Sequence, residues 1–275
     1  MNDAGLKPGA KKYIRQEWID ACHFHPMGDR EVLREVARQT AATAGAAAPL
    51  VLLDLDSTLY EVGPRTHFIL KEWMQSPEAR PHAQVRAALE RMEQEHVGYS
   101  VRDTLLALGF PVEKVGSAEM VDALESIKNF WASRFFTSEY LKHDRAYPGA
   151  SEFARAMHER GAHLIYLTGR DEPGMGDGTR DNLLRDGFPW EKPRTHLLLK
   201  RTFHEPDLEH KKAAATYVKS HGQLVASFEN EPPNIVALYD IFPQAMHVFV
   251  DTVYSDHPAE ARQGLYKIES FAHLD

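Results

Sequence analysis

The chain has 275 residues, 43% of them hydrophobic and 26% charged, which is typical of a globular protein with a sizeable buried core. It has no apolar run of roughly 18 residues that could span a bilayer, and its net charge of −8 argues against a general nucleic-acid surface. Because Cys22 is the only cysteine and the N-terminus carries no apolar leader, we expect a cytoplasmic protein without an internal disulfide.

The first 48 residues are predicted to form an N-terminal helical extension. Residues 13–40 place Val32, Leu33 and Val36 among charged neighbours at helical spacing. The alanine-rich stretch 41–49 then predicts a connector. This extension is a candidate contact surface for a partner or for a homodimer.

Five short apolar runs beyond the extension predict β-strands. They cover residues 50–56, 162–170, 195–200, 224–230 and 246–252. Helical patterns lie between them, at residues 152–160, 179–186, 208–220 and 235–241. Strands that alternate with helices are typical of parallel sheets. We therefore expect an α/β fold, a Rossmann-like parallel sheet of about five strands flanked by helices, built from residues 49–63 and 145–275.

Residues 64–144 interrupt this alternation and predict an inserted, all-helical cap. One helix is expected from Ser100, with Asp103 completing a capping box, to Gly109. A second helix carries an apolar stripe at spacings of three and four, formed by Val121, Leu124, Ile127, Trp131 and Phe135. The insertion is therefore expected to have a small core of its own.

Three of the predicted strands end in polar residues. These are Asp54, Asp56 and Thr58 after the first strand, Thr168, Gly169 and Arg170 after the second, and Glu229, Asn230 and Glu231 after the fourth. Two adjacent lysines, Lys211 and Lys212, begin the helix that leads to the fourth strand. Because ligands of open α/β sheets bind outside the carboxyl ends of the strands, we expect these groups to converge on one site.

The convergence of several carboxylates has chemical consequences. Carboxylates that crowd at one sheet edge repel one another unless a cation lies among them, and hard oxygen ligands select Mg2+. A carboxylate can also attack phosphorus, while a metal and a lysine neutralise the transferring group. A second acid two residues further on can move a proton.

Four stretches resemble the motifs of the haloacid dehalogenase superfamily, in the same order along the chain. "LLDLDST" (residues 52–58) is similar to motif I and "LIYLTGR" (residues 164–170) to motif II. "EHKKAAATYV" (residues 209–218) resembles motif III, and "LVASFENEPPN" (residues 224–234) resembles the acidic motif IV.

The resemblance implies a role for each matched residue. Asp54 is implied as the nucleophile and Asp56 as the general acid/base, with the Asp54 carboxylate and the Asp56 backbone carbonyl on Mg2+. Thr168 would hold a phosphate oxygen, and either Lys211 or Lys212 would stabilise the transferring group; the spacing favours Lys211. The same loops make candidate phosphate or substrate contacts of Ser57, Thr58, Gly169, Arg170 and Lys212.

Motif IV departs from the family pattern. Phe228 and Glu229 stand where the family has Gly-Asp, and Asn234 stands at the second acid of the longer form. Glu229 is implied as the third metal ligand, with Asn234 on the metal or on a water bound to it. We expect these replacements to affect metal affinity more than the class of reaction.

The acid at Asp56 resembles the phosphatases and phosphomutases of the superfamily, because its dehalogenases need no acid there. The expected function is a Mg2+-dependent phosphatase that acts on a small phosphorylated metabolite through an aspartyl-phosphate. Two alternatives stay open: a phosphotransferase or phosphomutase of the same superfamily, and a catalytically weakened binding or scaffold protein that kept the fold.

Two further stretches have weaker interpretations. "GMGDG" (residues 174–178) predicts a flexible turn rather than a dinucleotide-binding loop, with Thr179 and Arg180 as second-rank substrate contacts. Tyr60, Arg65 and His67 are expected near the cleft entrance, and Trp73 in the core.

Overall fold

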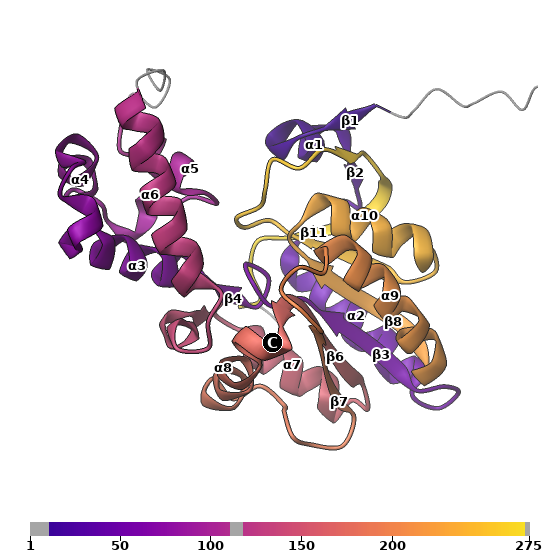
Figure 1. Ribbon diagram of the computed structural model, residues 1–275. Helices are drawn as coiled ribbons and strands as arrows, with labels where there is room; N and C mark the ends of the chain where they lie inside the picture. The colour runs from indigo at the N-terminus through magenta and orange to yellow at the C-terminus, as the bar shows by residue number, and fades with distance from the viewer. Residues whose placement is uncertain (1–10, 111–117, 273–275) are drawn as a thin grey trace, which may run out of the picture.

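The computed structural model of the protein describes residues 11–110 and 118–272. Its centre is a seven-stranded, wholly parallel sheet in the order β2-β11-β9-β8-β3-β6-β7 (Figure 1). The strands are β2 (His23–Phe24), β3 (Pro49–Leu53), β6 (His163–Asp171), β7 (Thr195–Lys200), β8 (Gln223–Glu229), β9 (Met246–Val250) and β11 (Gln263–Ile268). The predicted α/β fold is confirmed, and all five expected strands lie in this sheet.

Helices cover both faces of the sheet, and the alternation of side chains in the strands explains why. In β3, Val51 and Leu53 pack toward one face and Leu50 and Leu52 toward the other. The first face carries α2 (Asp29–Thr43), α7 (Ala150–Glu159) and part of α8 (Glu172–Arg185), and the second carries α9 (Asp207–His221) and α10 (Pro232–Ile241). A strand with apolar residues on both sides therefore lies at the centre.

The N-terminal segment is more closely joined to the sheet than a separate helix would be. The single helix expected over residues 13–40 is wrong: α1 (Arg15–Ala21) and α2 are separated by β2, which pairs with β11. A strand of two residues has no periodicity that a sequence pattern could show. Helix α2 lays its predicted apolar face, including Val32 and Val36, into the main core. Residues 1–10 of the predicted extension lie outside the described residues.

Two further pairs of short strands lie outside the seven-stranded sheet. Strand β1 (Lys12–Tyr13) pairs with β10 (Ala259–Glu260). Strands β4 (Tyr60–Glu61) and β5 (Arg145–Ala146) pair antiparallel, where the chain leaves the sheet for the insertion and returns from it. Within the described residues, no helix is long and apolar enough to cross a membrane.

The insertion forms a helical cap beside the sheet (Figure 1). Its described helices are α3 (Gly63–Gln75), η1 (Pro77–Ala79), α4 (Ala83–Leu89), η2 (Gln94–His96), α5 (Val101–Ala107), α6 (Ala118–Phe135) and η4 (Tyr140–His143). They enclose a separate hydrophobic cluster that includes Leu70, Leu105 and Ile127. The capping box at Ser100 is confirmed, since Ser100 Oγ accepts from the Asp103 amide at 3.1 Å. Val121 differs from the predicted stripe and is exposed.

Helix α8 contains the stretch 174–178, so the prediction of a flexible turn there is wrong. Asp171 Oδ2 caps the helix by accepting from the Gly174 amide at 2.9 Å, and a proline follows in the first turn. The glycines allow a close approach to the cap's return segment. A Cβ at Gly178 would lie 2.5 Å from the backbone oxygen of Ser138.

Candidate active site

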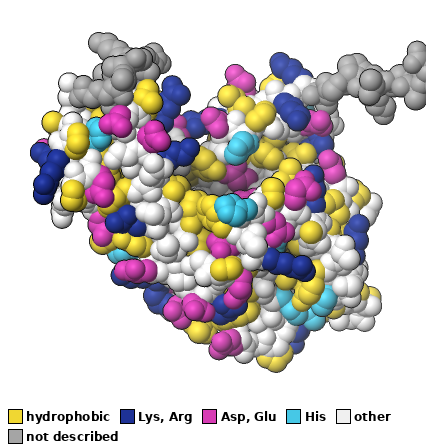
Figure 2. Space-filling view, viewed as in Figure 1, with side chains coloured by type: hydrophobic (Ala, Val, Ile, Leu, Met, Phe, Trp, Pro, Cys, Tyr) yellow, Lys and Arg dark blue, Asp and Glu magenta, His cyan; other side chains and the backbone are white. Residues whose placement is uncertain are grey.

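A cavity of about 420 Å3 lies between the cap and the carboxyl ends of the sheet strands. Figure 2 shows the surface hollowed at this junction. Its lining brings together most of the predicted site residues: Asp54, Asp56, Ser57, Thr168, Gly169, Arg170, Lys211, Glu229 and Asn234. Strand ends that are far apart in sequence therefore meet at one edge, as the parallel topology requires.

Asp54 follows β3 directly and lies at the floor of the cavity, only 4% exposed. Lys211 Nζ lies 2.7 Å from its Oδ1, and the Thr58 hydroxyl donates to its Oδ2 at 2.9 Å. Burial and the neighbouring charge of Glu229 raise the pKa of Asp54 to about 7, against the opposing effect of Lys211. Thr58 therefore lies behind the carboxylate and orients it.

The structure distinguishes the two lysines. Lys211 is buried and bridges Asp54 and Glu229, with its Nζ 2.5 Å from Glu229 Oε2. Burial alone would lower the pKa of Lys211, but the two carboxylates outweigh it and raise that pKa. Lys212 points to solvent and pairs with Glu209 at 3.1 Å. Its predicted role as a phosphate contact is not supported, because successive helical side chains face different directions.

Glu229 is fully buried, and both of its carboxylate oxygens accept hydrogen bonds. Its Oε1 accepts from the Glu231 amide at 3.1 Å and from Asn234 Nδ2 at 3.4 Å, while Oε2 faces Lys211. Burial raises the pKa of Glu229, opposed by Lys211. The longer glutamate side chain thus reaches the same lysine as Asp54.

The possible metal ligands around Asp54 and Glu229 suit a cation that prefers oxygen more than they suit zinc. In the described part of the chain no three His, Cys, Asp or Glu side chains are grouped as a metal cage. Two carboxylates, Asp54 and Glu229, lie close enough to share one ammonium, and the Asn234 amide adjoins them. A site of two carboxylates and neutral oxygens suits Mg2+, which keeps several of its waters.

Thr168 and its neighbours form the opposite side of the floor. Thr168 is fully buried at the carboxyl end of β6, and its Oγ1 accepts from the Arg170 amide at 3.3 Å. Ser57 turns the chain after Asp56 in a left-handed conformation, with φ of +59°. A Cβ at Gly169 would lie 2.6 Å from the Asp207 carboxylate, the end of a side chain that is 58% exposed and can shift.

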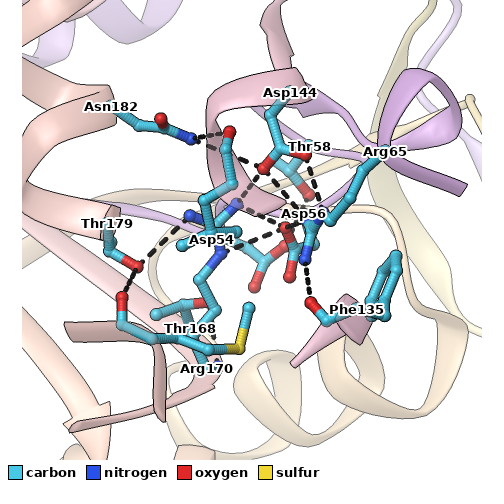
Figure 3. A network of polar contacts seen from close by, with 12 residues as sticks. Asp54, Asp56, Thr58, Arg65, Phe135, Asp144, Thr168, Arg170, Thr179 and Asn182 are labelled. Atoms are coloured by element: carbon cyan, nitrogen blue, oxygen red, sulfur yellow. Dashed lines mark hydrogen bonds and ion pairs between the residues drawn. The ribbon is translucent and has the colours of Figure 1, made fainter. Parts of the chain in front are cut away.

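Asp56 is held by two buried arginines (Figure 3). Its Oδ1 lies 2.5 Å from Arg170 Nη2 and 3.0 Å from Arg65 Nη2. Asp144, at the end of the cap, pairs with Arg65 at 2.8 Å and with Arg170 at 2.9 Å. Burial would raise the pKa of Asp56, but Arg170 and Arg65 outweigh it and hold that pKa well below its usual range. In this arrangement Asp56 is an anion.

The arginine cluster changes the predicted role of Arg170 and adds two residues to the site. Arg170 is 1% exposed, and its guanidinium donates hydrogen bonds to Asp56, Asp144 and the Thr179 hydroxyl. Arg65 was expected near the cleft because it follows motif I, whereas Asp144 carried no sequence signal. The two are 79 positions apart, and no local pattern joins residues at that separation.

The remaining predicted neighbours lie outside the cavity. Arg180 pairs with Glu172 at 2.8 Å on the surface of α8. His67 faces the carbonyl of Met92 at 3.4 Å. Trp73 is buried in the cap core, as expected.

No family model matches the chain, and no curated protein matches it in sequence. Among solved structures, it resembles a candidate phosphatase from Clostridium difficile, with 13% identity, a TM-score of 0.50, and coverage of 81% of this chain and 94% of that one. A candidate haloacid dehalogenase-like hydrolase from Burkholderia xenovorans LB400 is 14% identical, with a TM-score of 0.47 and coverage of 82% of this chain and 94% of that one. A protein described as a predicted phosphoglycolate phosphatase from Haemophilus somnus is 13% identical, with a TM-score of 0.48 and coverage of 82% of this chain and 95% of that one.

The likeness to the first of these structures is a likeness of fold. Likeness at this level of identity establishes the fold and leaves the activity to the chemistry of the site.

Proposed function

We propose that the chain is a Mg2+-dependent phosphatase that hydrolyses a small phosphorylated metabolite through an aspartyl-phosphate. One observation carries the proposal: the buried Asp54 carboxylate, held by Lys211 and Thr58, lies at the floor of a cavity under a helical cap. A carboxylate fixed at both oxygens is pre-positioned for attack in line with a leaving group. Thr168 lines the same cavity, and its hydroxyl would donate to a phosphate oxygen.

The first step joins an Asp54 oxygen to phosphorus and breaks the bond from phosphorus to the ester oxygen. Lys211 offsets the negative charge that gathers on the transferring group. The departing oxygen takes its proton from water, because the Asp56 anion has none to give while both arginines hold it. Since Asp56 is anionic while it is paired with Arg65 and Arg170, it acts in this arrangement as a base more readily than as an acid.

The second step is the attack of water on the aspartyl-phosphate. Asp56 accepts the proton of that water, phosphate leaves, and the Asp54 carboxylate is regenerated. Mg2+, where bound, would be held by the Asp54 and Glu229 carboxylates and the Asp56 backbone carbonyl, with Asn234 beside them. It would neutralise charge on the phosphoryl group.

The test is release of phosphate from acetyl phosphate with Mg2+ and with EDTA. We expect turnover that requires the metal and falls at least about 1,000-fold in Asp54→Asn, because no nucleophile remains. Lys212→Gln is the matched control for Lys211→Gln: only the latter should lose activity. Turnover that survives Asp54→Asn would contradict the proposal.

A binding protein that kept the fold is the second candidate, and the arginine cluster favours it. A proton-transfer residue locked by two guanidinium groups is poorly suited to donate a proton. This candidate predicts that phosphate-ester hydrolysis is absent across a broad panel and that calorimetry detects no Mg2+ binding.

A further inference from the structure

The cavity is larger than a phosphate group requires. Its volume of about 420 Å3 falls among those of pockets for small organic ligands, roughly 300–1,000 Å3. The side formed by the sheet carries carboxylates, a hydroxyl and an ammonium group. The side formed largely by the cap carries several aromatic rings among smaller side chains, and the organic part of a substrate whose phosphate lies at Asp54 would meet them.

Besides Tyr99, four rings on this second side form what we call the aromatic wall: Trp131 and Phe135 at the end of α6, Phe136 directly after it, and Phe203 in the loop after β7. Trp131 and Phe135 are stacked with centroids 4.2 Å apart. Phe136 meets Phe203 edge to face at 4.9 Å. The contact joins the cap to the sheet domain, so the wall is continuous across the cavity.

Two rings of the wall, Trp131 and Phe135, are held by contacts with α3. Trp131 Nε1 donates to Thr66 Oγ1 at 3.1 Å, and the Arg65 guanidinium lies 3.9 Å from the centre of the Phe135 ring. Phe203 is nonetheless 47% exposed, which leaves ring surface free to be covered. A rigid apolar surface favours a flat, rigid group, because neither side loses much conformational freedom.

The charges around the cavity exclude a second acidic group on the ligand. Its three lining cations are already paired: Lys211 with Asp54 and Glu229, Arg170 with Asp56 and Asp144, and Lys200 with Asp207 at 2.9 Å. Two further lining acids, Glu61 and Glu231, form no ion pair with any described cationic side chain. A carboxylate on the organic part would meet repulsion without a partner.

We infer that the substrate is a phosphate monoester whose organic part is an uncharged planar ring lying against the aromatic wall and bearing no second acidic group. This inference deepens the proposed function and rests on it. Aryl phosphates and nucleoside monophosphates share this chemistry, whereas phosphorylated hydroxy acids and sugar phosphates lack it.

Binding to the Asp54→Asn protein separates recognition from turnover. We would titrate it, with Mg2+ present, with phenyl phosphate, adenosine monophosphate, phosphoglycolate, glucose 6-phosphate and inorganic phosphate, and measure Kd by calorimetry. Stacking predicts Kd values at least about 10-fold lower for the two ring compounds. The ratio of these two to each other then distinguishes aryl from nucleoside ligands. Equal Kd values across the panel, or tighter binding of phosphoglycolate, would overturn the inference.

Two variants test the wall itself. Phe203→Ala removes an exposed ring, so the fold should survive, and we expect the preference for ring compounds over inorganic phosphate to fall about 5- to 10-fold. Phe68→Ala is the matched control: Phe68 is 40% exposed on α3 and stacks on His143 outside the cavity. An equal loss of preference in both variants, or in neither, would count against the wall.

Failure of this inference differs from failure of the proposed function. Hydrolysis of acetyl phosphate without a preference for ring compounds in binding would support the proposed phosphatase activity and contradict the inference of a ring substrate. A preference for ring compounds in binding without hydrolysis of any ester would support recognition by the aromatic wall and contradict the proposed phosphatase activity.

Discussion

Asp144 holds together the charges on which Asp56 depends. It is 3% exposed and pairs with both Arg65 and Arg170, neither of which reaches solvent. Two buried guanidinium groups need two carboxylates, and Asp56 is the second. A buried charge that loses its partner costs more than the pair contributed while intact.

Asp144→Asn should therefore lower the free energy of unfolding by about 3–5 kcal/mol, measured by urea denaturation. Asp177→Asn is the control, because Asp177 is 97% exposed at its side chain and should leave the urea midpoint unchanged. An Asp144→Asn protein as stable as wild type would show that Asp56 alone satisfies both arginines.

The contact between α8 and the cap's return segment is an element-scale feature. The Ser138 amide donates to the carbonyl of Gly174 at 2.7 Å, and Ser138 Oγ accepts from the Gly178 amide at 3.1 Å. Such an approach requires the bare backbone of glycine at both helical positions. The glycines that suggested a turn are thus explained by packing.

Gly178→Ala should destabilise the protein by roughly 1–3 kcal/mol, because its Cβ would lie 2.5 Å from a backbone oxygen that cannot move independently. Gly176→Ala is the matched control on the same helix. Its Cβ would meet only the ends of Arg180 and Glu172, and alanine is the better helix former. If a urea titration shows Gly178→Ala and Gly176→Ala to be equally destabilised, helix propensity or burial, rather than the Ser138 contact, determines the cost of the substitution.

A pair of histidines joins β6 and β7 at the sheet edge away from the cavity. His163 Nδ1 and His196 Nε2 are buried and have no hydrogen-bond partner among the residues that the structure describes, and the two rings are 5.9 Å apart. Burial lowers the pKa of both, reinforced for His163 by Arg194, His221 and His158, and for His196 by the other histidines. The folded protein therefore binds protons at these rings less readily than the unfolded chain.

The contribution of these two rings to stability should be fully present above the unfolded histidine pKa of about 6.5 and be lost as the pH drops below it, because the unfolded chain then binds more protons there. Thermal melts of wild type and variants between pH 7.5 and 5.5 test this. The double variant His163→Gln, His196→Asn should lose less stability than wild type over this range, whereas His23→Gln, exposed on β2, should behave as wild type. A dependence that survives the double variant would place its origin elsewhere.

Sequence periodicity found the elements that bury a continuous apolar run and missed those that depend on neighbours. Strand β3 is apolar on both sides and was predicted within a few residues, whereas β11 mixes exposed and buried residues and β2 has two residues. The same distinction holds in the site. Asp54, Thr168, Lys211 and Glu229 lie in local motifs at strand or helix ends, while the link from Arg65 to Asp144 exists only after the cap has folded.

At the scale of the molecule, two of the contacts between the cap and the rest of the chain lie away from the cavity. One is the α8 contact. The other is an ion pair between Arg15, at the start of α1, and Asp103 in the cap, with Nη2 2.9 Å from Oδ2. Arg15 is 42% exposed at its side chain, so the pair contributes about 0.2–1 kcal/mol. That is too little to change global stability, yet enough to shift a cap equilibrium up to about 5-fold.

Arg15→Asn should therefore widen the distance distribution between cap and sheet domain without lowering the melting temperature. Asparagine suits the test because Arg15 has a φ of +46°, and asparagine tolerates this left-handed region. Spin labels at Glu125→Cys and Lys212→Cys, in a Cys22→Ala background, report the distance, with exposed Arg102→Asn as the matched control. Because salt screens exposed pairs, wild type in 1 M NaCl should approach the variant. If the variant's distribution matches wild type at low salt, the ion pair does not restrain the cap, and the other contacts between cap and core hold it.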